Sequence, residues 1–345
     1  MELSGILRRT WQARGVPALL LLPLAGAFSL LAALRRRLYL LRLFRSERLP
    51  VPVVIIGNIT AGGSGKTPLT LWLALQLSGR GRHPGIVSRG YGSNLAPGQV
   101  REVLADSDVR EVGDEPLLLK RRSALPVFVG RDRVAAARAL LAAHADCDLI
   151  LSDDGLQHYR LARDVEIAVL DERGLMNGWP LPAGPLRESA TRLGSVDALV
   201  LNGLPHVPGC TAPVFAMRLA GTTFYALADP KRTCDAAALR HQCLAAVAGM
   251  GVPRRFFDHL SSLGLEFSAH GFPDHHRYVV ADLSAIAADA LLMTEKDAVK
   301  CTGLTQCPVW VLPISAQVGP AQSGIDLAAH VENCIRERLH GRPPA

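Results

Sequence analysis

The chain has 345 residues, of which 49% are hydrophobic and 20% are charged. This length fits about two domains of roughly 100–200 residues, and the composition excludes a disordered or fibrous protein. The first 50 residues hold nine Arg, no Lys and two Glu, and they carry the whole net charge of +7. Because the rest of the chain is neutral, nucleic acid is not an expected partner. Seven scattered Cys without a C-x-x-C pair argue against a disulfide framework or a zinc site and favour a reducing compartment.

The N-terminal segment contains 19 consecutive uncharged residues, Val16 to Leu34. A run of this length can cross a bilayer as a helix, with a kink at Pro23. A signal peptide would export the nucleotide site described below, and a buried core helix would not need arginines at both ends. We therefore predict that residues 1–48 form a membrane anchor that spans the bilayer or dips into one leaflet. Six Arg after the run and three before it place the body of the protein on the cytoplasmic side.

Beyond residue 48, short apolar runs alternate with helical stretches. They predict strands at 51–57, 84–88, 126–130, 148–153, 165–171 and 197–203, with helices at 68–77 and 134–143. Apolar strands separated by helices indicate a parallel sheet covered on both faces. A second alternation predicts strands at 243–251, 290–297 and 308–314, with helices at 253–263 and 325–339. We predict a P-loop NTPase-like α/β lobe over 49–215, a linker at 216–240 and a smaller second α/β lobe over 241–345.

The strongest motif is GNITAGGSGKTP at 57–68, which follows a strand and opens a helix as a Walker A motif does. Its glycines let the backbone approach phosphate oxygens, and the N–H groups of the helix N-terminus bind the anion. Lys66 is expected to neutralise the β- and γ-phosphates of ATP, and Thr67 to place its hydroxyl on Mg²⁺. Thr60 stands where the motif normally has its first glycine. The predicted nucleotide-binding residues are Thr60, Ala61, Gly62, Gly63, Ser64, Gly65, Lys66 and Thr67.

An apolar strand that ends in two carboxylates, DLILSDDG at 148–155, predicts the Walker B partner of this loop. Adjacent side chains of an extended chain point to opposite sides. We therefore expect one of Asp153 and Asp154 to take Mg²⁺, directly or through water, and the other to anchor a neighbouring loop. Asp154 is the favoured metal ligand.

Seven further polar clusters have no explanation in a generic P-loop protein. They are SRGYG (88–92), GDEP (113–116), GRDR (130–133), DDGLQH (153–158), PAGPLRE (182–188), FPDHHRY (272–278) and MTEKDAVK (293–300). In this order, after the Walker A motif, they resemble the tetraacyldisaccharide 4′-kinase (lipid A 4′-kinase) family over essentially the whole chain. The resemblance implies a membrane-associated P-loop kinase with two α/β lobes joined by a β-ribbon linker.

The same resemblance implies an activity and a location. The expected reaction transfers the γ-phosphoryl group of ATP to the 4′-hydroxyl of a tetraacylated, 1-phosphorylated glucosamine disaccharide, which gives lipid IVA. The expected location is the bacterial inner membrane, with the catalytic body on its cytoplasmic side.

Site residues also follow from the resemblance. Asp114 of GDEP matches the family's catalytic Asp, which accepts the proton of the acceptor hydroxyl, and Lys66 stabilises the transferred phosphoryl group. The DHH of FPDHHRY matches its His partner; we favour His275, which directly follows Asp274, and His276 stays an alternative. The residues expected to bind the acceptor or its phosphate are Tyr91, Glu115, Arg131, Arg187 and His276.

Two other classes of P-loop protein remain alternatives. A membrane-tethered nucleotide switch or partitioning ATPase would carry K-G-G-x-G-K-T, but this chain has Ala61 where that motif needs Lys. A GTP-driven module would read guanine with N-K-x-D or T-K-x-D, whereas the order at 294–297 is Thr-Glu-Lys-Asp. A switch would hydrolyse nucleotide without an acylated disaccharide, and a kinase would need the disaccharide.

Overall fold

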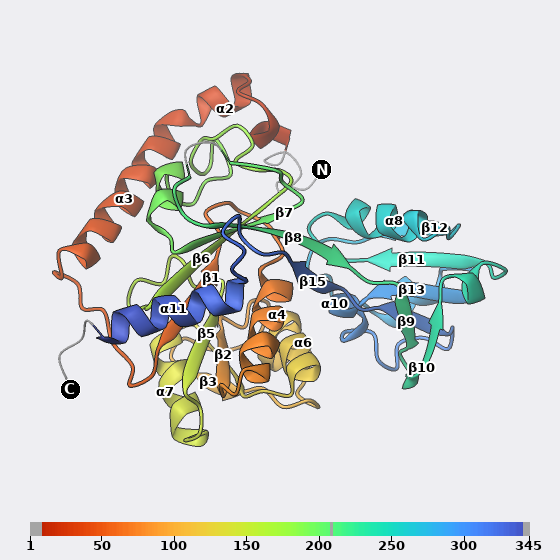
Figure 1. Cartoon of the computed structure of the whole chain (residues 1–345). Helices are drawn as coiled ribbons and strands as arrows, with labels where there is room; N and C mark the ends of the chain where they lie inside the picture. Colours follow the sequence, from red (N-terminus) through yellow and green to blue (C-terminus); the bar gives the residue numbers. More distant parts are fainter. Residues whose placement is uncertain (1–8, 208–209, 341–345) are drawn as a thin grey trace.

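The computed structural model describes residues 9–207 and 210–340, and two sheets divide it into a large and a small lobe (Figure 1). The large sheet has the strand order β15-β8-β7-β6-β1-β5-β2-β4-β3. Adjacent strands are parallel except for the two edge pairs, β15 with β8 and β3 with β4, which are antiparallel. Its strands are β1 (Val53–Gly57), β2 (Pro84–Ser88), β3 (Val100–Glu102), β4 (Val127–Gly130), β5 (Leu149–Asp153), β6 (Val165–Asp171), β7 (Ala198–Asn202), β8 (Val214–Ala220) and β15 (Ser315–Val318).

Both faces of the large sheet are covered, as the uniformly apolar strands predict. Along β1, Val54 and Ile56 pack into one buried cluster, and Val53 and Ile55 into another on the opposite face. Helices on the first face are α4 (Lys66–Gly79), α5 (Val109–Val112), α6 (Asp114–Ser123) and α11 (Leu327–His340), and α7 (Arg133–Ala143) covers the second. The predicted α/β class with a large parallel sheet is therefore confirmed.

The small lobe is a second α/β unit. Its sheet has the order β10-β9-β14-β13-β11-β12, in which the last four strands are parallel and β9 and β10 form an antiparallel hairpin. The strands are β9 (Thr223–Ala226), β10 (Asp229–Asp235), β11 (Leu244–Ala248), β12 (Ser268–Gly271), β13 (Ala290–Thr294) and β14 (Val309–Leu312). The helices are α8 (Pro253–Ser262), α9 (Val280–Ser284) and α10 (Glu295–Ala298).

The lobes are connected by the antiparallel strands β8 and β15, which lead the chain into the small lobe and back. We predicted that the second lobe extends over 241–345, but β15 pairs with β8 in the large sheet, and α11 buries Leu327 and Val331 against that sheet. In the predicted linker, 216–240, β8 likewise belongs to the large sheet and the β9–β10 hairpin to the small one. The last five residues of the predicted lobe lie outside the described residues.

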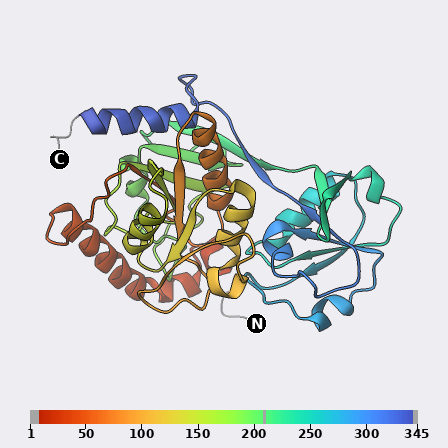
Figure 2. The same cartoon turned by 90° about the horizontal axis from the view of Figure 1, so that it is seen from below.

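The N-terminal segment includes the helices α2 (Val16–Leu20) and α3 (Leu22–Leu40), which lie on the side of the large lobe opposite α11 (Figure 2). The predicted kink at Pro23 is a break at Leu21, because proline lacks an N–H and its ring clashes with the carbonyl four residues earlier. The anchor's first eight residues lie outside the described residues. In the part of the chain that the structure describes, no helix combines the length and apolarity needed to cross a membrane. The predicted spanning helix is therefore not found there: α2 is short, and α3 includes Arg35–Arg37.

Candidate active site

The Walker A segment joins β1 to α4 at the carboxyl edge of the large sheet, where ligands bind in open α/β sheets. Gly62 and Gly65 have φ values of 102° and 92°, a left-handed region that only glycine adopts readily. The buried amide of Asn58 holds the loop by donating to the Gly62 carbonyl at 3.3 Å and to Ser64 Oγ at 3.2 Å. Asn58 belongs to the motif, yet sequence reasoning assigned it no role.

The two carboxylates of the Walker B strand have different surroundings. Asp153 is buried, and it accepts hydrogen bonds from Thr67 Oγ1 at 3.2 Å and Thr70 Oγ1 at 3.0 Å. Asp154 lies 3.6 Å from Lys66 Nζ and 3.3 Å from Arg187 Nη1. We favoured Asp154 as the metal ligand, but the structure places Asp153 beside the Thr67 hydroxyl and Asp154 among the cations.

The charge balance of this pair fits a bound cation. Burial, together with the charge of Glu115, raises the pKa of Asp153 to about 7. Burial also opposes ionisation of Asp154, but Lys66 and Arg187 outweigh it and lower the pKa of that carboxyl. Asp153 is therefore a buried carboxylate that a divalent cation would stabilise, and hydroxyl and carboxylate oxygens are the ligands that Mg²⁺ prefers. Among the described residues, no group of three or more His, Cys, Asp or Glu could hold a metal ion.

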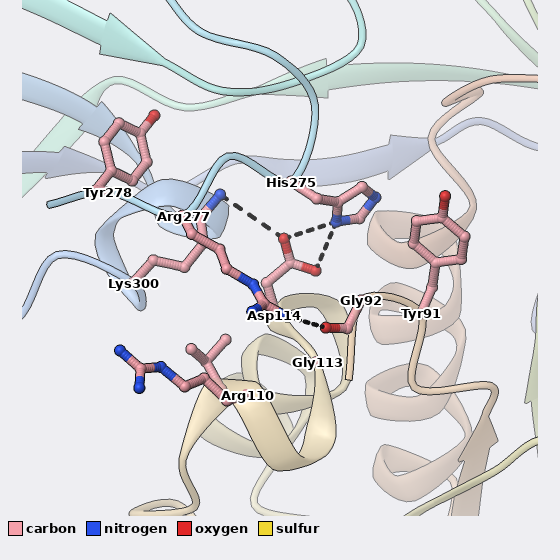
Figure 3. Close-up of a pocket in the computed structure, with 10 residues that line it drawn as sticks. Tyr91, Gly92, Arg110, Gly113, Asp114, His275, Arg277, Tyr278 and Lys300 are labelled. Carbon is pink, nitrogen blue, oxygen red and sulfur yellow. Dashed lines mark hydrogen bonds and ion pairs between the residues drawn. The ribbon is translucent and has the colours of Figure 1, made fainter. Parts of the chain in front are cut away.

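A second polar centre joins the two lobes. Asp114, the first residue of α6, is buried in the large lobe, and both its oxygens lie 3.0–3.1 Å from Nδ1 of His275. His275 comes from the loop between β12 and α9 of the small lobe. Lys300 Nζ lies 3.8 Å from the same carboxylate, in a pocket of about 80 Å³ (Figure 3). The structure thus brings together the predicted Asp–His pair, and it selects His275 over His276.

The pairing shifts the two pKa values in opposite directions. Burial raises the pKa of Asp114, but the hydrogen bond from His275 and the nearby Lys296 and Lys300 outweigh it and lower that pKa. Burial lowers the pKa of His275, but the hydrogen bond to Asp114 and the Asp114 charge outweigh it and raise that pKa. Each group therefore favours the charged form of the other.

This pair should stabilise the protein over a limited pH range. The raised pKa of His275 gives stability that is complete below the ordinary value of about 6.5 and is lost as pH rises through the folded-state pKa. The lowered pKa of Asp114 gives stability that is complete above about 4 and is lost as pH falls. We expect the Tm difference between wild type and His275→Gln to be largest between about pH 4 and 6.5 and smaller above pH 8. A difference that stays constant from pH 5 to pH 9, measured by calorimetry, would contradict the ion pair.

Three of the predicted acceptor-binding residues lie at these centres. The Tyr91 ring is 4.8 Å from the His275 ring, Glu115 Oε1 is 3.1 Å from Lys296 Nζ, and Arg187 contacts Asp154.

The structure does not bring the other two, Arg131 and His276, into the site. Arg131 is exposed, and the buried residue of its GRDR motif is Arg133, whose Nη2 donates to the Asp154 carbonyl at 3.3 Å. His276 Nε2 lies 2.9 Å from Oδ2 of Asp282, a residue of α9. Motif membership could have indicated Arg133, but only the fold shows which arginine points inward.

Sequence reasoning also missed a link between the small lobe and the phosphate loop. Asp171, at the end of β6, accepts from Arg173 Nε and from Arg255 Nη2 of α8, both at 2.8 Å. Arg173 Nη2 in turn donates to the Gly63 carbonyl at 2.9 Å. The sequence signal that could have found Asp171 is an apolar strand that ends in Asp, which is the pattern that predicted the Walker B strand β5.

A Walker A loop after the central strand of a parallel sheet, with a buried Walker B carboxylate and a carboxylate–His pair beside it, defines the class of P-loop phosphotransferases. The family model described as "Tetraacyldisaccharide-1-P 4′-kinase" matches residues 17–332, and the chain belongs to this family. The predicted resemblance is thus confirmed.

Known proteins of the same family are similar over nearly their whole length. The tetraacyldisaccharide 4′-kinase of Azoarcus sp. (strain BH72) is 52% identical over 97% of this chain and 96% of its own. The protein of that name from Dechloromonas aromatica (strain RCB) is 53% identical over 99% of this chain and 100% of its own. The crystal structure of "apo" form LpxK from Aquifex aeolicus in complex with ATP has a TM-score of 0.78 and 27% identity, covering 93% of this chain and 99% of that one.

Proposed function

We propose that this chain transfers the γ-phosphoryl group of ATP to the 4′-hydroxyl of a tetraacyldisaccharide 1-phosphate, with Mg²⁺ as the metal ion, and so forms lipid IVA. Family membership supports the reaction, and the pairing of Asp114 with His275 across the two lobes is the structural observation that carries it. A nucleotide switch needs no proton acceptor for a sugar hydroxyl. It would also need Lys in place of Ala61.

The predicted residues that the structure brings together have roles that their positions support. Lys66 and the N-terminus of α4 hold the phosphates, and Thr67 and Asp153, with Asp154 nearby, would hold Mg²⁺. When bound, Mg²⁺ neutralises charge on the phosphates and orients them. Asp114 accepts the proton of the acceptor hydroxyl, and His275 orients the Asp114 carboxylate through Nδ1. Tyr91, beside His275, and Arg187, beside Asp154, would contact the acceptor.

The direct test is incubation of the purified chain with ATP, Mg²⁺ and tetraacyldisaccharide 1-phosphate in detergent, followed by mass spectrometry of the lipid. We expect the lipid to gain one phosphoryl group and ATP turnover to depend on the lipid. ATP hydrolysis at the same rate without the lipid would favour the nucleotide switch instead.

We also propose that α2 and α3 attach the protein to the cytoplasmic face of the inner membrane by lying in the interface rather than spanning it. Leu20, Leu24, Leu30 and Leu31 are 61–76% exposed, and arginines follow them in the last turns of α3. An exposed apolar helix surface with flanking basic residues is typical of an interfacial anchor. Such an anchor brings the site close to an acceptor that carries four acyl chains.

Replacing Leu20, Leu24 and Leu31 together by Ser should release most of the protein from membranes. These exposed leucines stabilise the bound state by burying their apolar side chains in lipid, and serine cannot do so. Flotation with anionic vesicles measures the bound fraction. Turnover of detergent-solubilised acceptor should stay near wild type. Leu75→Ser, at an exposed leucine of α4, is the matched control. Full flotation of the triple variant would place the membrane contact elsewhere.

A further inference from the structure

One lysine of the MTEKDAVK motif lies where the two lobes meet. Lys296, on α10 of the small lobe, has its Nζ 3.1 Å from Glu115 Oε1 of the large lobe and 3.1 Å from Asp274 Oδ1 of its own lobe. The same nitrogen lies 3.4 Å from Nε2 of His275. Its side chain is only 19% exposed, so these three groups are its main partners. Family resemblance and the Walker motifs leave this lysine without a role.

The contact with Lys296 determines where His275 carries its proton. A lysine ammonium has three N–H donors and no acceptor, so Nε2 of His275 can only accept from it. The ring proton of a neutral imidazole must then lie on Nδ1, which is the nitrogen that faces the Asp114 carboxylate at 3.0–3.1 Å. Lys296 and Asp114 therefore select the same tautomer from the two sides of the ring.

Lys296 also neutralises the charge of a second carboxylate near the His275 ring, that of Asp274. Asp274 Oδ1 lies 3.7 Å from His275 Nε2 and would favour a proton there, but the same oxygen lies 3.1 Å from Lys296. Without the lysine, the imidazole would lie between Asp114 and Asp274, and an opposite charge within about 4–6 Å favours the protonated ring. The groups around this ring are Asp114 and Glu115 of α6, Lys296 of α10, Lys300 after it, Asp274 and Arg277 of the His275 loop, Arg110 of α5, and the Tyr91 ring.

We propose that Lys296 is a positioning residue for phosphoryl transfer: it opposes protonation of the His275 ring and keeps the single proton of the neutral ring on Nδ1, facing Asp114. An imidazolium would form a full ion pair with Asp114 and make that carboxylate a weaker acceptor for the hydroxyl proton. The inference rests on the proposed function, in which Asp114 is the base. Because Glu115 and Asp114 belong to the other lobe, the arrangement is complete only when the lobes meet.

The pH dependence of kcat separates this role from a merely structural one. In Lys296→Met the pKa of His275 should rise, and a rise of one unit multiplies the protonated fraction relative to the neutral one by about ten. We expect kcat to fall about ten-fold near pH 7 and to recover to about wild type at pH 9, so that the acidic limb moves to higher pH. A loss of equal size at every pH would overturn the proposal.

Two further variants use the charges around the ring. Adding Asp274→Asn to Lys296→Met removes the second carboxylate and should move the acidic limb back toward wild type. Lys296→Arg keeps the charge and should retain most of the activity at pH 7. Lys231→Met, at an exposed lysine of β10, is the matched control and should leave the profile unchanged. If the double variant kept the profile of Lys296→Met, the balancing role of Lys296 would be wrong.

A measurement without acceptor distinguishes failure of this inference from failure of the proposed function. In full-length protein labelled with ¹⁵N-histidine, the His275 ring is identified by its loss in His275→Gln. We expect the Nδ1–H tautomer above pH 8 and an increased pKa in Lys296→Met. An Nε2–H tautomer in the wild type would overturn the inference even if the kinase reaction is observed, and the expected spectra together with no lipid phosphorylation would overturn only the function.

Discussion

Lys66→Ala should lower kcat by about 10²–10³-fold, the loss typical when one electrostatic contact to a developing charge is removed. Lys66 is the first residue of α4, and its side chain is 11% exposed, so its charge acts in a poorly solvated place. Negative charge builds on the transferred phosphoryl group in the transition state, and Lys66 is the single lysine of residues 57–68 that could stabilise that charge. The measurement is kcat at saturating ATP and lipid.

The control for this change is a lysine outside the site. Lys231→Ala removes the same charge from the exposed strand β10 and should leave kcat within about two-fold of wild type, as for a surface substitution. Circular dichroism should show the same fold for both variants. Near-wild-type turnover of Lys66→Ala would refute the assignment of residues 57–68 as the phosphate loop.

Asp114→Asn should lower kcat by about 10²–10⁴-fold, the range that general base catalysis supplies. Asn has nearly the same shape as Asp but cannot accept the hydroxyl proton at neutral pH. The KM for ATP should change little, because Asp114 contacts His275 and Lys300 and its proposed role is at the acceptor hydroxyl and not at the nucleotide. Steady-state kinetics with each substrate varied in turn will separate these two effects.

A double-mutant cycle tests whether Asp114 and His275 act as one unit. His275→Gln should be milder than Asp114→Asn, because His275 only orients and tunes the carboxylate. The double variant should be little worse than Asp114→Asn alone, since residues that act together are non-additive. His276→Gln is the matched control, because His276 pairs with Asp282 and not with the site. Losses that simply multiply would separate Asp114 from His275.

Local patterns of the sequence were sufficient to predict most strands and the phosphate loop. The predicted strands at 84–88 and 165–171 coincide with β2 and β6, and the helix after GSGKT begins at Lys66. These elements depend on neighbouring residues: β-branched apolar runs favour buried strands, and glycines before a helix permit the left-handed backbone of the loop. The family resemblance pointed to Asp114 and His275, which no local pattern would have paired across 161 positions.

Tertiary structure decided what depends on contacts between distant parts of the chain. Whether Asp153 or Asp154 contacts the Thr67 hydroxyl depends on how β5 lies beside α4. Which arginine of the GRDR motif points inward depends on how α7 packs. The contact between Lys296 and Glu115 joins residues 181 positions apart. The return of β15 and α11 to the large sheet likewise depends on pairing with β8, a strand about 100 residues earlier in the chain. By itself, then, the sequence determined the class of fold, the phosphate loop and the family. The protonation of the Asp–His pair and the surroundings of each carboxylate came from the tertiary structure, because charge interactions depend on distances and burial that only the packed lobes define.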